Sequence, residues 1–362
     1  MTDPEVVVQT HDLTKQYGEF TALDSLSMQV GRGQILGFIG PNGAGKTTTI
    51  RILVGLLKPT SGSASIAGAD CLQDARKIRR LVGYMPDDFG SYNNMRVSEY
   101  LDFFGAAYGI GRRRRTERID EVLEITHASH MKDLFVDALS RGMQQKVAIA
   151  RTLMHDPQVL ILDEPANGLD PQARIEMRGM LLRLSGLGKT LIVTSHILPE
   201  LARVCDLVAM ITKGKLRAFG TVDDIMRNVR QRRTFEILLL QHDQVDRVAA
   251  LVRDWFQQHA AQETSGQTDV TGAEAEMMVR FSTSLNDQAI SPLLGHLVSR
   301  GEPVAQFREV TADLEDAFLS VAGSDDTTPG SDSQAAADAT EAAAAERRSS
   351  HPTGPTKETP SR

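Results

Sequence analysis

The sequence predicts an α/β protein built around a mostly parallel β-sheet, with a small α+β domain and a disordered tail behind it. Three runs carry this prediction: GRGQILGFIG at 31–40, a turn and a short strand before a glycine-rich loop, VLILDEP at 159–165 and TLIVTSH at 190–196. Each run has the length and the flanking turn residues of a buried strand. A helical stretch at 171–184 separates the last two, and alternation of strands with helices is typical of a parallel sheet.

Composition limits the class of protein. The 362 residues are 41% hydrophobic and 24% charged, which suffices for one sizeable core and a smaller second unit. The net charge of -7 disfavours a general nucleic-acid-binding surface, so we expect no nucleic-acid partner. Cys71 and Cys205 form no metal-binding or redox pattern. No apolar run reaches the roughly 20 residues of a membrane span, and the first residues lack the features of a secretory signal.

Changes in pattern along the chain predict three segments. Residues 5–222 form the first domain, in which helical spacing of apolar residues predicts a helical insert at about 90–150. The run LVAMI predicts a further strand, and TKGKLRAFG after it predicts a turn. Residues 234–322 form a small second domain containing FEILLLQ, MMVRFS and a helical ending, LEDAFLSVAG. Residues 323–362 have almost no large apolar side chains, which predicts a disordered tail.

The most specific motif is GPNGAGKT at residues 40–47, between a predicted strand and a predicted helix that extends to about Leu56. This is the phosphate-loop pattern, in which glycines let successive backbone N–H groups face phosphate oxygens. Lys46 supplies a positive charge for the phosphates, and Thr47 supplies a hydroxyl for Mg²⁺. The alternative is a flexible turn, which the strand and helix on either side disfavour. The remaining predicted nucleotide-binding residues of the loop are Gly40, Pro41, Asn42, Gly43, Ala44, Gly45 and Thr48.

Two acids end the predicted strand VLILDEP. Asp163 and Glu164 stand at its carboxyl end, where parallel sheets present their ligands. Asp163 is the expected ligand of Mg²⁺, and Glu164 is expected to polarise the water that attacks the γ-phosphate of ATP. The alternative is a strand that ends in two solvated acids, which the phosphate loop elsewhere in the sequence disfavours.

With both motifs present, residues 5 to about 220 resemble the ATP-binding cassette (ABC) ATPases, because four further motifs of that family occur in order. They are LTKQYG with Tyr17, LSRGMQQK with Ser140 and Gly142, ANGLD with Asp170, and TLIVTSH with His196. The resemblance implies a P-loop NTPase cassette with an antiparallel N-terminal β subdomain and a helical insert.

The resemblance also implies roles for these residues. Tyr17 would stack on adenine, and His196 would sense the γ-phosphate and order the attacking water. Ser140 and Gly142 would contact the γ-phosphate of ATP bound to the opposite subunit, while Asp170 would lie in the dimer-contact loop. Ser140 also stands where a helix N-cap is expected. The alternatives are a surface strand tyrosine, an ordinary capped helix and a structural histidine.

This sequence departs from the family pattern at three places. In the signature motif, Arg141 replaces the usual glycine and Met143 the usual glutamine. In VGYMPDDFG, Asp87 stands where the family has a glutamine that completes the Mg²⁺ shell. A carboxylate also provides oxygen ligands for Mg²⁺, so we predict Asp87 as a metal ligand beside Thr47 and Asp163.

The resemblance to the ABC ATPases also implies a function. It implies a cassette dimer, expected to be a homodimer, that binds and hydrolyses ATP with Mg²⁺ beneath a separate transmembrane permease at the cytoplasmic face of the membrane. The segment MPDDFGSYNNMRVSEYLDFFGAAYGI, the LSRGM variant and the LEDAFL ending resemble the bacterial exporter subclass. The alternatives are a soluble ABC-type ATPase acting on nucleic acid or ribosomes, and a small-molecule kinase. The kinase would need neither LSRGMQQ nor His196.

The run RRRR at 112–115 has two interpretations. It is either a patch that faces phospholipid or the solvated start of a helix whose acids, Glu117, Asp120 and Glu121, follow closely. The nearby acids favour the solvated helix.

Overall fold

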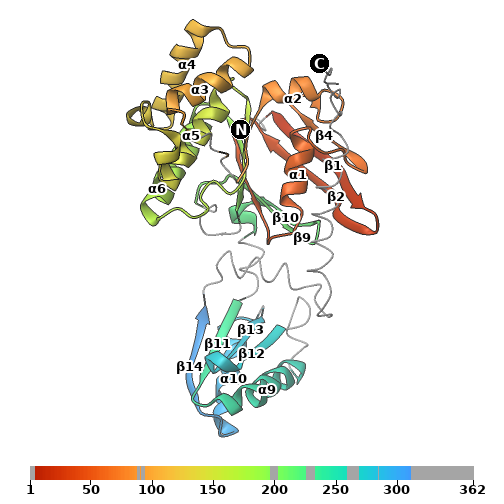
Figure 1. Cartoon of the computed structure of the whole chain (residues 1–362). Coiled ribbons are helices and arrows are strands. Elements are labelled where there is room, and N and C mark those ends of the chain that lie inside the picture. The colour runs from red at the N-terminus through yellow and green to blue at the C-terminus, as the bar shows by residue number, and fades with distance from the viewer. Residues whose placement is uncertain are drawn as a thin grey trace, which may run out of the picture. The chain divides into compact units, whose positions relative to one another are not determined.

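The computed structural model describes residues 5–87, 90, 94–195, 203–225, 233–258, 269–283 and 285–310 (Figure 1). The chain forms two compact units, a larger one that extends to Phe219 and a smaller one over Gly220–Ala322. His196, the predicted helical ending LEDAFLSVAG and the predicted disordered tail lie outside the described residues. None of the helices in the described parts of the chain combines the length and the apolar character that crossing a bilayer requires.

A six-stranded sheet in the order β10-β9-β3-β8-β7-β6 forms the core of the larger unit. The five strands from β9 to β6 run parallel, which confirms the predicted fold class. β3, β7 and β8 are buried over their whole length, so their sequences are continuous apolar runs rather than alternating ones. The strands are β3 (Ile35–Ile39), β6 (Val82–Met85), β7 (Val159–Leu162), β8 (Thr190–Ser195), β9 (Leu207–Thr212) and β10 (Lys215–Thr221).

The larger unit also contains an antiparallel sheet with the strand order β2-β1-β4-β5, as the family resemblance predicted. In the chain, β1 and β2 come before helix α1, and β4 and β5 come after it. One hydrophobic cluster joins this antiparallel sheet to the parallel sheet: Leu13 and Leu26 pack with Phe38 of β3 and with Ile50 and Leu53 of the helix that follows β3. All five side chains are fully buried. The strands are β1 (Val6–Tyr17), β2 (Phe20–Gly31), β4 (Ser61–Ile66) and β5 (Ala69–Asp70).

Helices α3, α4 and α5 pack on one another in the region of the predicted helical insert, and α5 also packs on β6. The helices of the larger unit are α1 (Lys46–Leu53), α2 (Ala75–Leu81), α3 (Val97–Ala107), α4 (Arg112–Ile125), α5 (Arg141–Leu153) and α6 (Pro171–Gly186), with short 3₁₀ turns at Ser129–Met131 and Val136–Ala138.

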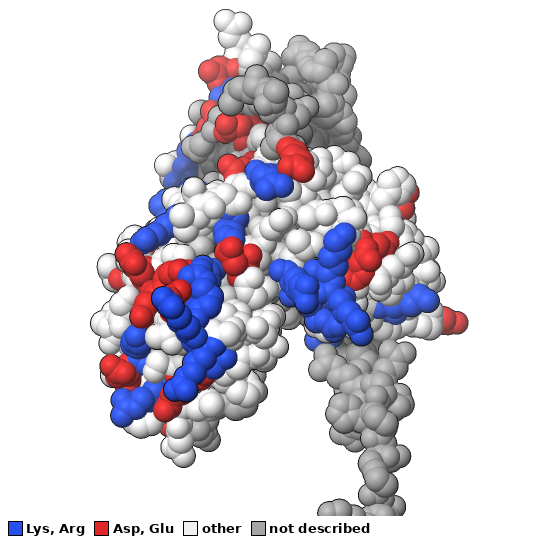
Figure 2. All heavy atoms as spheres, turned by 90° about the horizontal axis from the view of Figure 1, so that it is seen from above, with Lys and Arg blue, Asp and Glu red and all other residues white. Residues whose placement is uncertain are grey.

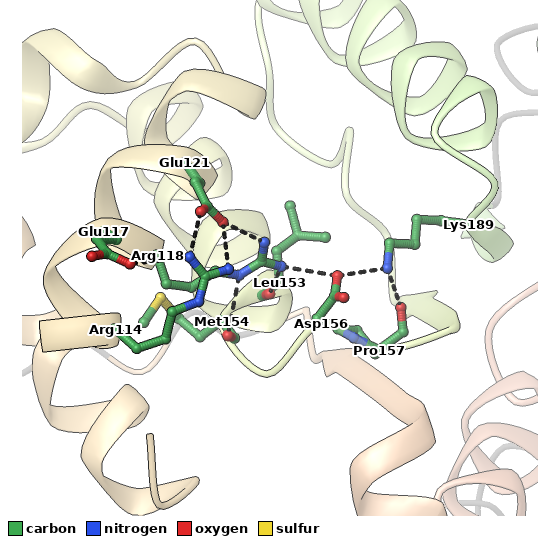
Figure 3. Close-up of polar contacts among 9 residues, drawn as sticks. All are labelled: Arg114, Glu117, Arg118, Glu121, Leu153, Met154, Asp156, Pro157 and Lys189. Atoms are coloured by element: carbon green, nitrogen blue, oxygen red, sulfur yellow. Dashed lines mark hydrogen bonds and ion pairs between the residues drawn. The ribbon is translucent and has the colours of Figure 1, made fainter. Parts of the chain in front are cut away.

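Arg118 fastens α4 to the segment between α5 and β7 (Figure 3). Its guanidinium donates hydrogen bonds to the carbonyl oxygens of Leu153 (2.6 Å) and Met154 (3.3 Å) and to Asp156 Oδ1 (3.1 Å). Asp156 also accepts a hydrogen bond from Lys189 Nζ at 2.8 Å, just before β8. The Arg118 side chain is only 11% exposed, so these bonds replace its water. These contacts hold the helical insert against the segments that lead into β7 and β8 of the parallel sheet.

Two sequence-based boundaries need correction. The run TKGKLRAFG is a turn only at Lys213 and Gly214, where φ is positive, and continues as the edge strand β10. An edge strand tolerates its charged residues because one side faces solvent, which weakens the strand pattern in the sequence. Helix α1 ends at Leu53 rather than near Leu56, because the chain turns at Gly55 with φ of 72°.

The smaller unit is a four-stranded antiparallel sheet, ordered β12-β13-β11-β14, with two helices in a βαββαβ sequence. This order is the ferredoxin-like arrangement. Its core includes a stacked pair, Phe235 and Phe281, with ring centroids 5.4 Å apart, and the buried Trp255. The elements are β11 (Arg233–Leu239), α9 (Val245–Gln258), β12 (Asp269–Ala273), β13 (Met278–Thr283), α10 (Asp287–Ser299) and β14 (Val304–Val310).

Candidate nucleotide-binding site

The loop between β3 and α1 requires glycine at defined positions. Gly43 and Gly45 have φ of 78° and 108°, in the region that other residues rarely adopt. At Gly40 a Cβ atom would lie 2.4 Å from the carbonyl oxygen of Ile211 on β9, so only glycine fits there. The predicted loop residues therefore form one tight backbone cradle at the carboxyl end of β3.

The first turn of α1 is open to an anion. Its N-cap, Gly45, provides no side-chain hydrogen bond to the free N–H groups of the turn. Pro41, Asn42 and Thr47 are exposed, and Thr48 is half-buried. A helix N-terminus with free N–H groups and exposed hydroxyls is suited to phosphate oxygens.

Lys46 is the charged group of this cradle. Its side chain is buried, and its ammonium donates hydrogen bonds to the carbonyl oxygens of Gly40 and Pro41, the latter at 3.2 Å. It also lies 3.9 Å from Glu164 Oε1. Burial lowers the pKa of Lys46, while the charges of Glu164 and Asp163 act in the opposite direction. The structure thus brings the phosphate loop and the two predicted acids together.

Asp163 and Glu164 follow β7 directly and are linked through Thr194 of β8. Thr194 Oγ1 donates to Asp163 Oδ1 at 2.7 Å and accepts from the backbone N–H of Glu164 at 2.9 Å. Glu164 has a φ of 50°, a strained backbone for a non-glycine residue. Sequence reasoning missed Thr194, although a hydroxyl residue two positions before the predicted His196 was a signal.

Burial raises the pKa of Asp163, and the negative charges of Glu164 and Asp87 act in the same direction. The hydrogen bond from Thr194 and the charge of Lys46 oppose this rise. An acid with a raised folded pKa favours the folded state most at low pH, and this contribution is lost as the pH rises through the folded pKa. At neutral pH, ionised Asp163 therefore destabilises the ligand-free protein.

Asp163→Asn is accordingly expected to raise the unfolding temperature of the ligand-free protein at neutral pH, because the amide carries no charge and its carbonyl still accepts from Thr194. The gain should shrink as the pH falls below the ordinary pKa of an aspartate. Thermal unfolding at a series of pH values, without nucleotide or Mg²⁺, measures this. The exposed Asp254→Asn is the control. An Asp163→Asn protein that melts no higher than wild type at neutral pH contradicts the expectation.

Asp87 belongs to the same electrostatic neighbourhood, because its charge contributes to the raised pKa of Asp163. Asn167 Nδ2 donates to Asp87 Oδ1 at 3.3 Å, and Arg141 lies 4.0 Å from the same oxygen. Arg141 Nε also donates to the carbonyl oxygen of Asn167 at 2.7 Å. The arginine that departs from the family signature therefore connects the start of α5 with the loop after Glu164. In the sequence, Arg141 stands out only as a departure from the family signature, and Asn167 lies in the motif ANGLD without a predicted role.

Ser140 and Asp170 are helix N-caps. Ser140 Oγ accepts a hydrogen bond from the backbone N–H of Met143 at 3.4 Å, as the sequence predicted for the start of α5. Asp170 Oδ1 accepts from the backbone N–H of Ala173 at 2.8 Å at the start of α6. Gly142 is half-buried in the first turn of α5. Among the described residues, the hydrogen bond of the Ser140 side chain is to Met143 and not to the phosphate loop of its own chain, and helices α1 and α5 lie well apart in Figure 1.

Tyr17 is the last residue of β1 and is partly exposed. The ammonium of Lys15 lies 4.7 Å from the centre of its ring. A partly exposed ring at a strand end is accessible to a flat aromatic ligand, as the expected adenine contact requires.

Together the fold and this site define a P-loop nucleoside triphosphatase. The family model described as "ABC transporter" matches residues 23–167, and the bacitracin transport ATP-binding protein BcrA of Bacillus licheniformis is 40% identical over 232 residues, covering 64% of this chain and 75% of BcrA. The chain belongs to the ATP-binding cassette transporter family, which confirms the resemblance.

Other relatives differ in extent. The probable multidrug ABC transporter ATP-binding protein YbhF of Escherichia coli is 36% identical over 263 residues, covering 72% of this chain but only 44% of YbhF. This chain thus spans less than half of YbhF. The linearmycin resistance ATP-binding protein LnrL of Bacillus subtilis is 28% identical over 317 residues, covering 88% of this chain and 98% of LnrL. A solved ATP-binding subunit of an ABC transporter has a TM-score of 0.56 at 31% identity, covering 62% of this chain and 93% of that chain.

Proposed function

We propose that this chain is the ATP-hydrolysing subunit of an ABC exporter, which drives a separate transmembrane permease by closing as an ATP-bound homodimer. The observation that carries the proposal is the position of Lys46, held in the phosphate loop and 3.9 Å from Glu164. A buried cation, a helix N-terminus and two strand-end acids at one place suit a nucleoside triphosphate. In this assignment residues 5–222 are the ATPase domain and 234–322 an accessory domain.

The residues present fit a Mg²⁺ ion. Thr47 offers an exposed hydroxyl, Asp163 a carboxylate that Thr194 holds in place, and Asp87 a second carboxylate nearby. Oxygen ligands of this kind are those that Mg²⁺ prefers. When bound, the ion would neutralise charge on the phosphates. It would also relieve the unfavourable ionisation of Asp163, because a positive charge lowers the pKa of a neighbouring acid.

Lys46 and Glu164 have different roles. Lys46 binds the phosphates, exchanging its present carbonyl partners Gly40 and Pro41 for phosphate oxygens. Glu164 accepts a hydrogen bond from the attacking water and orients it. The hydrogen bond between its backbone N–H and Thr194 fixes the strained turn that directs this carboxylate. We assign His196 to the γ-phosphate and Tyr17 to adenine on the family resemblance alone.

The second half of each site is proposed to come from a second copy of the chain. Ser140 and Gly142 open α5 with N–H groups that its own phosphate loop does not use, and a helix N-terminus attracts an anion. Asp170 stands at the opening of α6, beside the loop that follows Glu164. Two copies related by a two-fold axis would place Ser140 of each over the nucleotide of the other.

Export is proposed from the names of the relatives, which include bacitracin transport, multidrug and linearmycin resistance proteins. The permease would hold the chain at the cytoplasmic face of the membrane. An ABC-type ATPase acting on nucleic acid or ribosomes is not favoured by these relatives. Co-expression with a candidate permease tests the proposal: the two proteins should co-purify, and ATP hydrolysis should respond to the permease. Failure to co-purify with any permease encoded beside the gene would contradict it.

Ser140→Ala is expected to lower ATP turnover by about 10²-fold, the usual effect of removing one donor to a developing negative charge. It also removes the N-cap of α5, which costs about 1 kcal/mol of stability. Asn286→Ala is the matched control, because Asn286 caps α10 in the smaller unit through the same type of bond. Steady-state ATPase rates distinguish the two effects. Equal turnover in both variants would contradict the shared site.

A further inference from the structure

Helix α2 carries a basic surface that the proposed nucleotide site does not use. In its sequence ARKIRRL, Ile78 is fully buried, whereas Arg76, Lys77, Arg79 and Arg80 are all exposed. Figure 2 views the larger unit from above, the side on which α2 and α4 lie in Figure 1. It shows a group of Lys and Arg side chains with acids only at its margin. Ile78 and the partly buried Leu81 pack on the core, and the four cations of the helix remain exposed.

The nearest acids in the sequence, Asp70 and Asp74, form hydrogen bonds with backbone N–H groups rather than ion pairs with these cations. Asp70 Oδ1 accepts hydrogen bonds from the backbone N–H groups of Leu72 and Gln73, both at 2.8 Å. Asp74 Oδ2 accepts from the backbone N–H of Asp70 at 3.1 Å. Both carboxylates therefore hold the turn that leads into α2. Within the described part of the chain, no acidic side chain forms an ion pair with a cation of α2.

The run at the start of α4 is different. Arg114 contacts Glu117 and Glu121, as Figure 3 shows, and Arg115 donates to Asp102 at 2.7 Å. In Figure 2, acids are interleaved with the second group of cations on this side. The structure thus agrees with the interpretation of RRRR as a solvated helix start, whereas the cations of α2 form no ion pairs with the described acids.

An apolar side chain accompanies the cations. Leu72, in the turn before α2, is 46% exposed, so part of its surface remains in water although it adjoins a charged helix. Exposed apolar residues beside clustered cations are typical of surfaces that lie on a membrane interface. An acidic protein segment or a nucleic acid would use the cations but would gain little from Leu72.

We propose that α2 and Leu72 form a contact surface for anionic phospholipid headgroups. This proposal rests on the proposed function to the extent that a permease brings the chain to the membrane. The net charge of -7 does not oppose it, because at physiological salt charges beyond about 8 Å are screened, and the local field of α2 dominates near the bilayer. Each cation near an anionic surface strengthens binding about fivefold.

Co-sedimentation of the full chain with vesicles tests the proposal. The chain should bind vesicles of phosphatidylcholine with phosphatidylglycerol, and not vesicles of phosphatidylcholine alone, with binding that weakens as salt increases. Arg79→Gln with Arg80→Gln should weaken binding by roughly thirtyfold. Leu72→Ser, added to the double variant, should weaken vesicle binding further. It should leave the salt dependence of that binding unchanged, because it removes no charge. The matched control is Arg253→Gln with Arg300→Gln, which removes the same charge at exposed positions of the smaller unit.

Equal binding to both kinds of vesicle overturns the proposal, as does an equal loss in the control variant. Loss of permease binding by the α2 variant with vesicle binding unchanged also overturns it and assigns the surface to a protein contact. Thermal unfolding and ATP turnover in solution should be unchanged in all variants. Vesicle binding requires neither ATP nor permease, so its failure and failure of the proposed function are separate results.

Discussion

Lys46→Ala is expected to weaken ATP binding by about 2–5 kcal/mol, or from about thirtyfold to several thousandfold. The side chain is buried, and its ammonium already stands within the loop that receives the phosphates. Without it, the triphosphate would meet Asp163 and Glu164 with no protein cation between them. The variant loses the attraction between Lys46 and the phosphates, and the two acids then repel the phosphates more strongly. Both effects weaken ATP binding.

Calorimetric titration of ATP into the purified chain measures this effect. Lys58→Ala is the control, because Lys58 is exposed and lies in the connection between α1 and β4. Thermal unfolding of the Lys46→Ala protein verifies that the fold survives. A variant that remains folded and binds ATP with wild-type affinity would disprove the placement of the triphosphate in this loop.

Glu164→Gln is expected to leave ATP binding intact while lowering hydrolysis by about 10²–10⁴-fold. The amide has the same shape and keeps the backbone hydrogen bond to Thr194, but it is not a base. Because bound ATP would persist, two copies should remain closed around it. Gel filtration with ATP and Mg²⁺ should therefore show a dimer that wild type forms only transiently.

The control for this variant is Glu176→Gln on α6, where the carboxylate pairs with Lys146 and stands outside the proposed site. It should hydrolyse ATP at the wild-type rate. A Glu164→Gln protein that stays monomeric with ATP bound would count against the shared site, and one that hydrolyses ATP normally would exclude Glu164 as the group that orients water.

The predictions for Lys46 and Glu164 depend on different levels of structure, one local and one tertiary. Lys46 is placed by local sequence, since it opens the helix that follows its own loop. Glu164 is placed by the pairing of β7 with β8, because Thr194 holds its backbone N–H and the neighbouring Asp163 at once. A change at Thr194 would therefore disturb both acids, although the motif TLIVTSH, which contains it, was singled out only for His196.

The sequence by itself determined the phosphate loop, the two strand-end acids, the N-cap at Ser140 and the class of fold. These features depend on residues a few positions apart, whose conformations follow from glycine, capping side chains and apolar spacing. A short stretch of chain contains all the information that such a feature needs.

Only the tertiary structure decided which distant groups meet. Strand pairing brought Thr194 to Asp163, and loop packing brought Arg141 and Asn167 to Asp87. Folding also left the cations of α2 without acidic partners while it gave partners to those of α4. The reason is that these contacts join residues far apart in the sequence, and their distances depend on how sheets and helices pack rather than on any local preference.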